Sequence, residues 1–309
     1  MLVVAFRTHV WDEHVDYLAR RIYASAAGCE FVILADETLQ TFDTTPFLKI
    51  AHTVDFSEFG LPLYPTNRSM WYNADYPLYR LRKERPDATH YAMIEYDVCA
   101  TVDLFKLSKH VEEAEIDLVA THLEDASKAN FPWHSGLVDK FNVPLKALIP
   151  FMVISGRAID HMYGKRRAIV EHKFPEQESD WPFCEGFIPS ASAEIENFKY
   201  LDYKTLYGCP YFWVEEPIHI ADKRCNEPNR INHPVMGGAR FIRAHFEGQK
   251  IHKLFENPEK SLYNLSFYHP NEYVSYLFEQ IKLFNSDDLK SEFIKLSGFW
   301  GWDGNPSYQ

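Results

Sequence analysis

The chain has 309 residues, 46% of them hydrophobic and 25% charged, and its 44 acidic and 32 basic side chains give a net charge of −12. This composition is ordinary for a globular protein and excludes a disordered, collagen-like or coiled-coil chain. The acidic balance argues against nucleic acid as a partner, because nonspecific binding needs cations that neutralise phosphates. No run of apolar residues in the sequence is long enough to cross a membrane, so we expect at most peripheral membrane contact.

The cysteine pattern and the first residues bear on the compartment. The five cysteines are scattered and form no C-x-x-C pair, so neither a disulfide framework nor a cysteine zinc site is predicted. Residues 1–14 lack the basic flank and long apolar core of a signal peptide. We therefore expect a cytoplasmic protein, with the inner face of the membrane as the alternative location.

A strand–helix–strand pattern opens the chain. Residues 2–6 form an apolar run rich in β-branched side chains, residues 11–27 carry apolar side chains at helical spacing, and residues 30–35 form a second apolar strand. This βαβ opening predicts a parallel sheet whose faces are covered by helices.

The middle of the chain continues the alternation. We expect a short strand at 50–54, a helix at 73–85 with Asp75 as its N-cap and Pro77 in its first turn, and a strand at 90–95. The remaining expected elements are helices at 104–114 and 158–171 and strands at 116–121 and 148–155.

The last third of the chain has a different character. Residues 174–234 look irregular and are rich in Pro, Trp and Tyr, whereas residues 272–283 and 289–296 have the spacing of amphipathic helices. We predict one α/β domain over residues 1–260, with a mostly parallel sheet flanked by helices, and a helical C-terminal extension at residues 261–309 packed on it.

Acidic side chains follow two of the predicted strands. Asp36 comes directly after the second strand, and Glu95 and Asp97 end the strand at 90–95. Ligands of open α/β sheets bind beyond the carboxyl ends of the strands, and two carboxylates there suit Mg²⁺ or Mn²⁺ on a nucleotide's phosphates. The sequence has no glycine-rich phosphate loop, which argues against a dinucleotide-binding enzyme and a P-loop NTPase. The alternative is a turn with solvated acids.

The stretch WYNADYPLYRLRKERPDATHYAMIEYDV, at residues 71–98, resembles the central segment of GT-A-type nucleotide-sugar glycosyltransferases. The resemblance spans roughly residues 2–235 and implies a GT-A-like (Rossmann-like) fold. In that family a D-x-D-like motif holds a divalent metal and the donor's diphosphate. The resemblance therefore implies this role for Glu95 and Asp97, with Glu in place of the first Asp.

The segment from Trp181 to Ser190 resembles a family segment in which an acid approaches the acceptor hydroxyl. This implies that Glu185 is the catalytic base of an inverting enzyme, whereas a retaining enzyme needs no such base. Its neighbours Trp181, Phe183 and Phe187 could raise its pKa and line a sugar pocket. The alternative is a loop glutamate among packed aromatic rings.

The resemblance also implies roles for four further residues. Arg7 lies where such folds hold the nucleotide base, Asp36 would contact the nucleotide, and Asp75 could reach the diphosphate, although capping would also explain Asp75. A third metal ligand would come from the C-terminal region, where His233 is the first candidate and His245 and His252 are others. Each histidine could equally be structural.

The leading hypothesis is a hexosyltransferase-type enzyme that moves a sugar from a nucleotide-sugar donor to a glycan, a lipid-linked or another hydroxyl acceptor. Mn²⁺ or Mg²⁺ would neutralise charge on the departing diphosphate, and the setting would be bacterial polysaccharide or glycoconjugate synthesis. One alternative is a non-catalytic sugar-nucleotide-binding scaffold, which Glu95 in the motif keeps open. Another is a metal-dependent hydrolase, although the sequence offers no close pair of histidines for it.

Overall fold

The computed structural model describes residues 1–66, 69–208, 217–238, 240–241 and 244. They fall into two compact units. The first unit comprises the described residues of 1–209 and 228–231, and the second comprises those of 210–227 and 232–309.

The first unit alternates strands and helices, as the sequence predicts. Its main elements in chain order are β1 (Leu2–Thr8), α1 (Glu13–Ser25), β2 (Glu30–Asp36), β3 (Leu48–His52), α2 (Ser69–Tyr72), α3 (Tyr76–Glu84), β4 (His90–Glu95), β5 (Cys99–Ala100), α4 (Leu104–Ala114), β6 (Leu118–Asp125), β7 (Leu145–Ser155), α5 (Gly156–His172), α6 (Cys184–Ser192) and β8 (Tyr200–Asp202).

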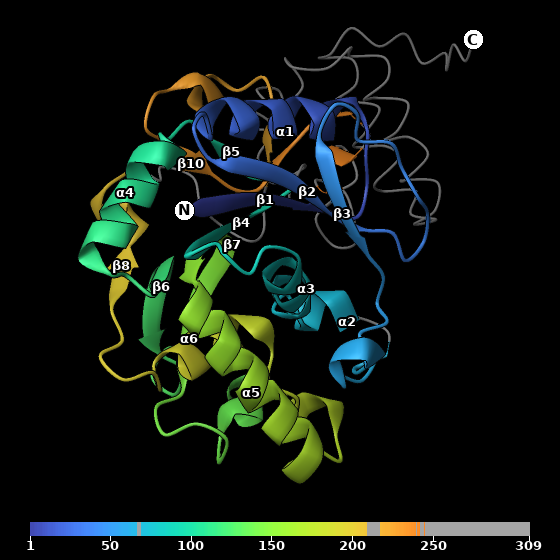
Figure 1. The fold of residues 1–309 in the computed structure, drawn as a ribbon, viewed down its shortest axis with the longest axis vertical. Coiled ribbons are helices and arrows are strands. Elements are labelled where there is room, and N and C mark those ends of the chain that lie inside the picture. The colour runs from blue at the N-terminus through green and yellow to red at the C-terminus, as the bar shows by residue number, and fades with distance from the viewer. Residues whose placement is uncertain (67–68, 209–216, 239, 242–243, 245–309) are drawn as a thin grey trace, which may run out of the picture. The chain divides into compact units, whose positions relative to one another are not determined.

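One seven-stranded sheet runs through this unit, in the order β3-β2-β1-β4-β7-β6-β8 (Figure 1). β1 pairs in parallel with β2 and β4, β2 pairs in parallel with β3, and β6 pairs in parallel with β8. β7 runs antiparallel to its neighbours β4 and β6. The prediction of a mostly parallel sheet is therefore confirmed.

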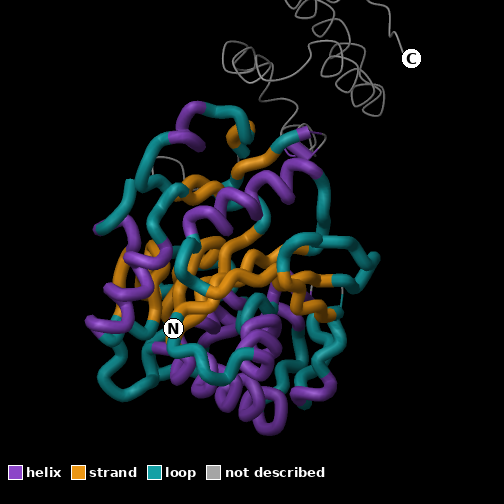
Figure 2. The backbone as a smooth tube through the Cα atoms, turned by 45° about the horizontal axis from the view of Figure 1, so that its top comes forward, coloured by secondary structure: helices purple, strands orange, loops and turns teal. Residues whose placement is uncertain are grey.

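Helices cover both faces of the sheet (Figure 2), which explains why its central strands are apolar on both sides. On one face, Val3, Val32 and Met93 of three adjacent strands share a core cluster with Leu78 of α3 and Ile159 of α5. α1 lies against the other face and buries its apolar stripe (Figure 1). The prediction of flanking helices is thus confirmed as well.

The irregular stretch expected at 174–234 contains the helix α6, which the sequence hides. Gly186 and Pro189 both lie inside α6 and both have low helix propensity. Packing overrides that preference: a Cβ on Gly186 would lie 2.7 Å from Leu137 Cδ1, so glycine permits a close approach between α6 and the loop before β7. The helix expected at 73–85 is α3, which begins three residues later, and the short helix α2 before it was not predicted.

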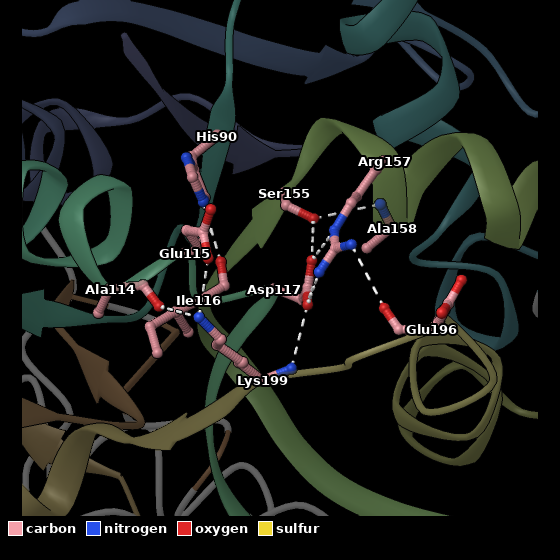
Figure 3. Close-up of polar contacts among 10 residues, drawn as sticks. All are labelled: His90, Ala114, Glu115, Ile116, Asp117, Ser155, Arg157, Ala158, Glu196 and Lys199. Atoms are coloured by element: carbon pink, nitrogen blue, oxygen red, sulfur yellow. Dashed lines mark hydrogen bonds and ion pairs between the residues drawn. The ribbon is translucent and has the colours of Figure 1, made fainter.

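A buried carboxylate directly before β6 accepts hydrogen bonds from the end of β7, the start of α5 and the chain before β8 (Figure 3). Asp117 accepts hydrogen bonds from Ser155 Oγ at 2.9 Å, from Arg157 Nε and Nη2 at 2.6 Å each, and from the Lys199 backbone nitrogen at 3.0 Å. Burial by itself would raise the pKa of Asp117, but these donors hold that pKa below its ordinary value. The β7–α5 junction and the chain before β8 are thereby tied to β6.

The second unit contains short described elements: β9 (Ile218–His219), a 3₁₀ helix at Lys223–Asn226 and β11 (Val235–Met236), with β9 and β11 paired in parallel. β10 (Ile231–Asn232) begins at the last residue of the first unit. The expected extension at 261–309, its two helices, His245 and His252 lie outside the described residues. Every helix in the described part of the chain is too short or too polar to span a lipid bilayer.

We expect Asp117→Asn to lower the free energy of unfolding by about 1–3 kcal/mol at pH 7, because Asn cannot accept all four charge-assisted hydrogen bonds. A carboxylate with a depressed pKa stabilises the fold above its unfolded pKa, and that stability is lost as the pH falls through the folded pKa. Urea unfolding should therefore show the gap between wild type and variant closing below about pH 4. Glu115→Gln, at an exposed partner of Lys199, is the control; a gap of unchanged size at low pH would contradict this account.

Candidate functional site

The strand order has a topological switch point between β1 and β4. Successive strands proceed from β1 to β2 and β3 on one side, whereas β4 lies on the other side of β1. At such a switch point the connections leave in opposite directions, and ligands bind beyond the carboxyl ends of the strands. Arg7 and Glu95 lie side by side there, because they are the last pair of residues in register between β1 and β4.

Glu95 and Arg7 form an ion pair at this edge. Arg7 Nη1 donates to Glu95 Oε1 at 3.0 Å, and Arg7 Nη2 donates to the Met70 carbonyl oxygen at 2.6 Å. Asp97 follows in the turn after β4 and is 7% exposed. The structure thus brings Arg7, Glu95 and Asp97 to one strand end, and gives Glu95 a cationic neighbour that the sequence does not reveal.

Asp36 ends β2 and lies beside His52, the last residue of β3, with which it is in register. Burial lowers the pKa of His52 to about 4, although its contact with the Thr53 carbonyl and the charge of Asp36 act in the opposite direction. The imidazole is therefore neutral at pH 7; its Nδ1, 3.2 Å from the Thr53 oxygen, donates and its Nε2 is left as an acceptor. Sequence reasoning missed His52, since no motif marks its burial.

Glu185 lies in the first turn of α6 rather than in a loop, and its side chain is partly buried. Burial, followed by the charge of Glu95, raises the pKa of Glu185 to about 7, while Lys146 acts in the opposite direction. The predicted rise in pKa is thus present. A carboxyl group that titrates near neutral pH can take up a proton from a bound hydroxyl group.

Lys146 reaches this edge because β7 runs antiparallel. Its first residues pair with the last residues of β6, Lys146 with Glu124, so the start of β7 lies where the parallel strands end. The Lys146 ammonium group is 3.7 Å from a Glu124 carboxylate oxygen. The sequence predicts a strand only from residue 148 and carries no sign of its direction, and Lys146 was missed for both reasons.

The structure gives Asp75 another role. Asp75 stands at the N-cap position of α3, as the sequence predicts, but its side chain makes no capping hydrogen bond. Asp75 is fully buried and accepts hydrogen bonds from Arg166 Nε at 3.0 Å, Arg166 Nη2 at 2.9 Å and the Tyr79 hydroxyl at 2.7 Å. Both carboxylate oxygens are engaged inside the core, so Asp75 has no accessible oxygen with which to reach a diphosphate.

All three aromatic residues expected around Glu185 are buried in the core, and Phe183 packs against Trp71, which is partly exposed. Trp181 and Phe187 are fully buried, so neither lines a sugar pocket. Phe183, by contrast, belongs to an aromatic cluster with Trp71 and Trp133. Its ring stacks on Trp133 with the centroids 4.2 Å apart, and its centroid is 4.7 Å from that of Trp71.

His233 belongs to the second unit and is buried there, directly after β10. The preceding Asn232 is buried too, and its Nδ2 donates to the Arg224 carbonyl oxygen at 3.1 Å. Burial and this hydrogen bond of the preceding residue hold the backbone at His233 in place. Its role as a third metal ligand stays a prediction.

No family model matches the chain, and no curated protein matches it by sequence. Its fold is similar to that of the galactosyltransferase LgtC in complex with donor and acceptor sugar analogues (14% identity, TM-score 0.39, 75% of this chain and 86% of that chain). It is also similar to mouse xyloside xylosyltransferase 1 (10%, 0.39, 75% and 96%) and to a putative glucose-1-phosphate thymidylyltransferase from Bacillus anthracis (8%, 0.36, 65% and 85%). Each similarity is one of fold alone.

We expect Glu185→Gln to stabilise the protein relative to wild type above about pH 5. The folded pKa of about 7 exceeds the ordinary value of 4.5, so ionisation is easier in the unfolded chain. Wild type should therefore lose up to about 3 kcal/mol relative to the variant as the pH rises from 4.5 to 7, and nothing more above that. Urea unfolding at half-unit pH steps measures this, with Glu178→Gln as the exposed control; parallel curves for wild type and Glu185→Gln would contradict the shift.

Proposed function

We propose that this protein is a glycosyltransferase that moves a sugar from a nucleotide-sugar donor to a hydroxyl group of a glycan or another acceptor. One observation carries the proposal: Glu185, with a pKa raised to about 7, faces the charge of Glu95 at the switch point of an open α/β sheet. A proton acceptor beside an acidic phosphate-handling motif is what transfer from a nucleoside diphosphate needs.

The donor side is assigned to the ends of β1, β2 and β4. We assign the nucleoside to Arg7 and Asp36, and the diphosphate to the neighbourhood of Glu95 and Asp97. Two carboxylates with an imidazole form a donor set that fits Mn²⁺ or Mg²⁺, so we assign the metal to Glu95, Asp97 and His233. When bound, such an ion stabilises the negative charge that develops on the departing diphosphate.

The ion pair between Arg7 and Glu95 bears on this assignment. A guanidinium group 3.0 Å from Glu95 Oε1 already balances the charge of that carboxylate. Metal binding through Glu95 therefore has to compete with Arg7 or to use the other carboxylate oxygen. This competition supports Asp97 as the ligand whose loss matters most.

On the acceptor side, the acceptor oxygen attacks the anomeric carbon of the donor sugar. The bond from that carbon to the phosphate oxygen breaks, and its electron pair leaves with the nucleoside diphosphate. The Glu185 carboxylate takes the proton that the acceptor hydroxyl group loses, so charge and atoms balance. The reaction inverts the anomeric centre, because attack and departure take place on opposite faces of one carbon.

The two other functions suggested by the sequence lead to different results in the same assays. A non-catalytic scaffold would bind the nucleotide and release nothing, whereas a metal-dependent hydrolase would yield free sugar in the absence of any acceptor. The setting of bacterial polysaccharide or glycoconjugate synthesis, in the cytoplasm or at the inner face of the membrane, stays an expectation of the sequence.

We expect one of UDP, GDP, CMP and dTDP to raise the melting temperature in the presence of Mn²⁺, because a ligand of the native state adds about 2.7 kcal/mol at 100 times its Kd. Asp97→Asn should abolish the metal-dependent part of the shift, and His233→Ala should weaken it. Asp16→Asn, at a surface ion pair of α1, is the matched control and should respond like wild type. If no nucleotide shifts the wild-type protein, the donor site is rejected.

We expect Glu185→Gln to reduce the rate of sugar transfer about 10²- to 10⁴-fold, the usual contribution of a general base. The nucleotide-induced melting shift should survive, because Glu185 takes no part in donor binding. The rate of wild type should rise with pH and level off once Glu185 is ionised. Release of nucleoside diphosphate, measured with a mixture of glycan acceptors, gives the rate; a variant as fast as wild type would remove Glu185 from the mechanism.

A further inference from the structure

We propose that the aromatic cluster of Trp71, Trp133 and Phe183 is a platform for a pyranose ring, and that the acceptor is therefore a sugar. The inference rests on the proposed transferase function and names the substrate class of its acceptor side. A pyranose ring has an apolar face of C–H groups and a polar rim, and a large aromatic surface matches that face.

One aromatic ring of the cluster, that of Trp71, is exposed to solvent. Among the tryptophans that the structure describes, Trp71 is the most exposed, with 50% of its surface accessible. Its ring centroid lies 4.7 Å from that of Phe183 and 5.5 Å from that of Trp133, with interplanar angles of 59° and 77°. Phe183 is itself buried beneath this arrangement. Trp71 is thus supported from below by packed rings while half of it faces solvent.

The backbone around Trp71 is tied to both halves of the candidate site. The Met70 carbonyl accepts from Arg7, the partner of Glu95, and the Trp71 carbonyl accepts from Cys184 Sγ at 3.3 Å. Cys184 directly precedes Glu185 at the start of α6. Trp71 therefore lies between the strand ends assigned to the donor and the residue assigned as the base.

Trp133 is held over Phe183 by a close approach of backbones. A Cβ on Gly136 would lie 2.6 Å from the Trp181 carbonyl oxygen, so only glycine lets the loop after β6 pack against the segment before α6. That contact fixes the loop three residues beyond Trp133. A pre-formed platform of this kind loses little conformational entropy when a ring is placed on it.

The position of the cluster favours the acceptor sugar over the donor sugar. Phe183 is two residues before Glu185, which takes a proton from the acceptor and makes no contact that the donor requires. A ring seated on Trp71 can direct a hydroxyl group toward that carboxylate. The donor sugar, by contrast, has to stay attached to a diphosphate near Glu95 and Asp97.

The probes are methyl β-D-glucopyranoside, methyl β-D-galactopyranoside and methyl α-D-mannopyranoside, observed by saturation-transfer NMR with the full chain at pH 7. At least one should receive saturation on its ring protons, and Trp71→Ala should weaken its binding at least tenfold. Trp71→Phe should retain most of the binding, because a stacking ring remains. Tyr17→Ala, at an exposed tyrosine of α1, is the control and should bind like wild type. The nucleotide-induced melting shift of Trp71→Ala should equal that of wild type, which also shows that the variant folds.

Several outcomes would overturn the inference while leaving the transferase intact. These are nucleotide binding without any glycoside signal, glycoside binding that Trp71→Ala does not weaken, equal saturation of glycerol, or displacement of the glycoside by the complete nucleotide sugar. The last would show that the ring occupies the donor's place. A glycoside signal that depends on Trp71, in a protein that no nucleotide stabilises, would support the platform and reject the transferase.

Discussion

The ion pair between Arg166 and Asp75 is the constraint on which the arrangement of this protein depends. Both side chains are fully buried, and two hydrogen bonds of 3.0 and 2.9 Å join them. The guanidinium carbon also lies 3.6 Å from the centroid of the Phe187 ring. An uncompensated charge in such a place costs about 3–5 kcal/mol. Displacing either side chain would therefore leave the other as an unpaired buried charge and destabilise the fold by about that amount. The pair therefore fixes the start of α3 against α5.

The same guanidinium group also binds the backbone of the segment that leads into the candidate site. Arg166 Nη1 donates to the Pro182 carbonyl oxygen at 3.1 Å, and the neighbouring Trp181 Nε1 donates to Asn73 Oδ1 at 2.7 Å. Asn73 directly follows α2, and Pro182 comes just before α6. One buried polar network thus holds the segment that carries Trp71 and the segment that carries Phe183 and Glu185. The sheet supplies the strand ends, and this network places the helices over them.

The parts of the fold that depend on local sequence could be predicted, and those that depend on distant partners could not. The opening βαβ unit and the acids at the ends of β2 and β4 follow from apolar runs and the residues directly after them. Asp75 looked like a cap because its partner, Arg166, lies 91 residues away and cannot be read from the surrounding sequence. α6 was hidden because its glycine is explained by the close approach of Leu137 and Phe131, which lie about 50 residues earlier in the chain.

The site was predicted to a similar extent, for the same physical reason. Arg7, Asp36, Glu95 and Asp97 occupy the carboxyl edge because strand ends are local features. Lys146 depends on the direction of β7, and the burial of His52 depends on how the chain packs around the end of β3, so no pattern indicated either. The rise in the pKa of Glu185 was predicted from neighbouring aromatic residues, yet the like charge of Glu95 contributes and all three of those neighbours are buried in the core.

The reversed direction of β7 has a consequence for how this surface can change. Because β7 is antiparallel to β6, the connection at residues 126–144 leaves the sheet and returns to it at the same edge. Surface connections tolerate insertions and replacements far better than strands do. The exposed positions of this connection can therefore diversify, whereas Gly136 and Leu137 stay fixed by their packing against the segment before α6 and against α6 itself. The ends of β1, β2 and β4 would keep their register while the surface beside Glu185 acquires a new shape.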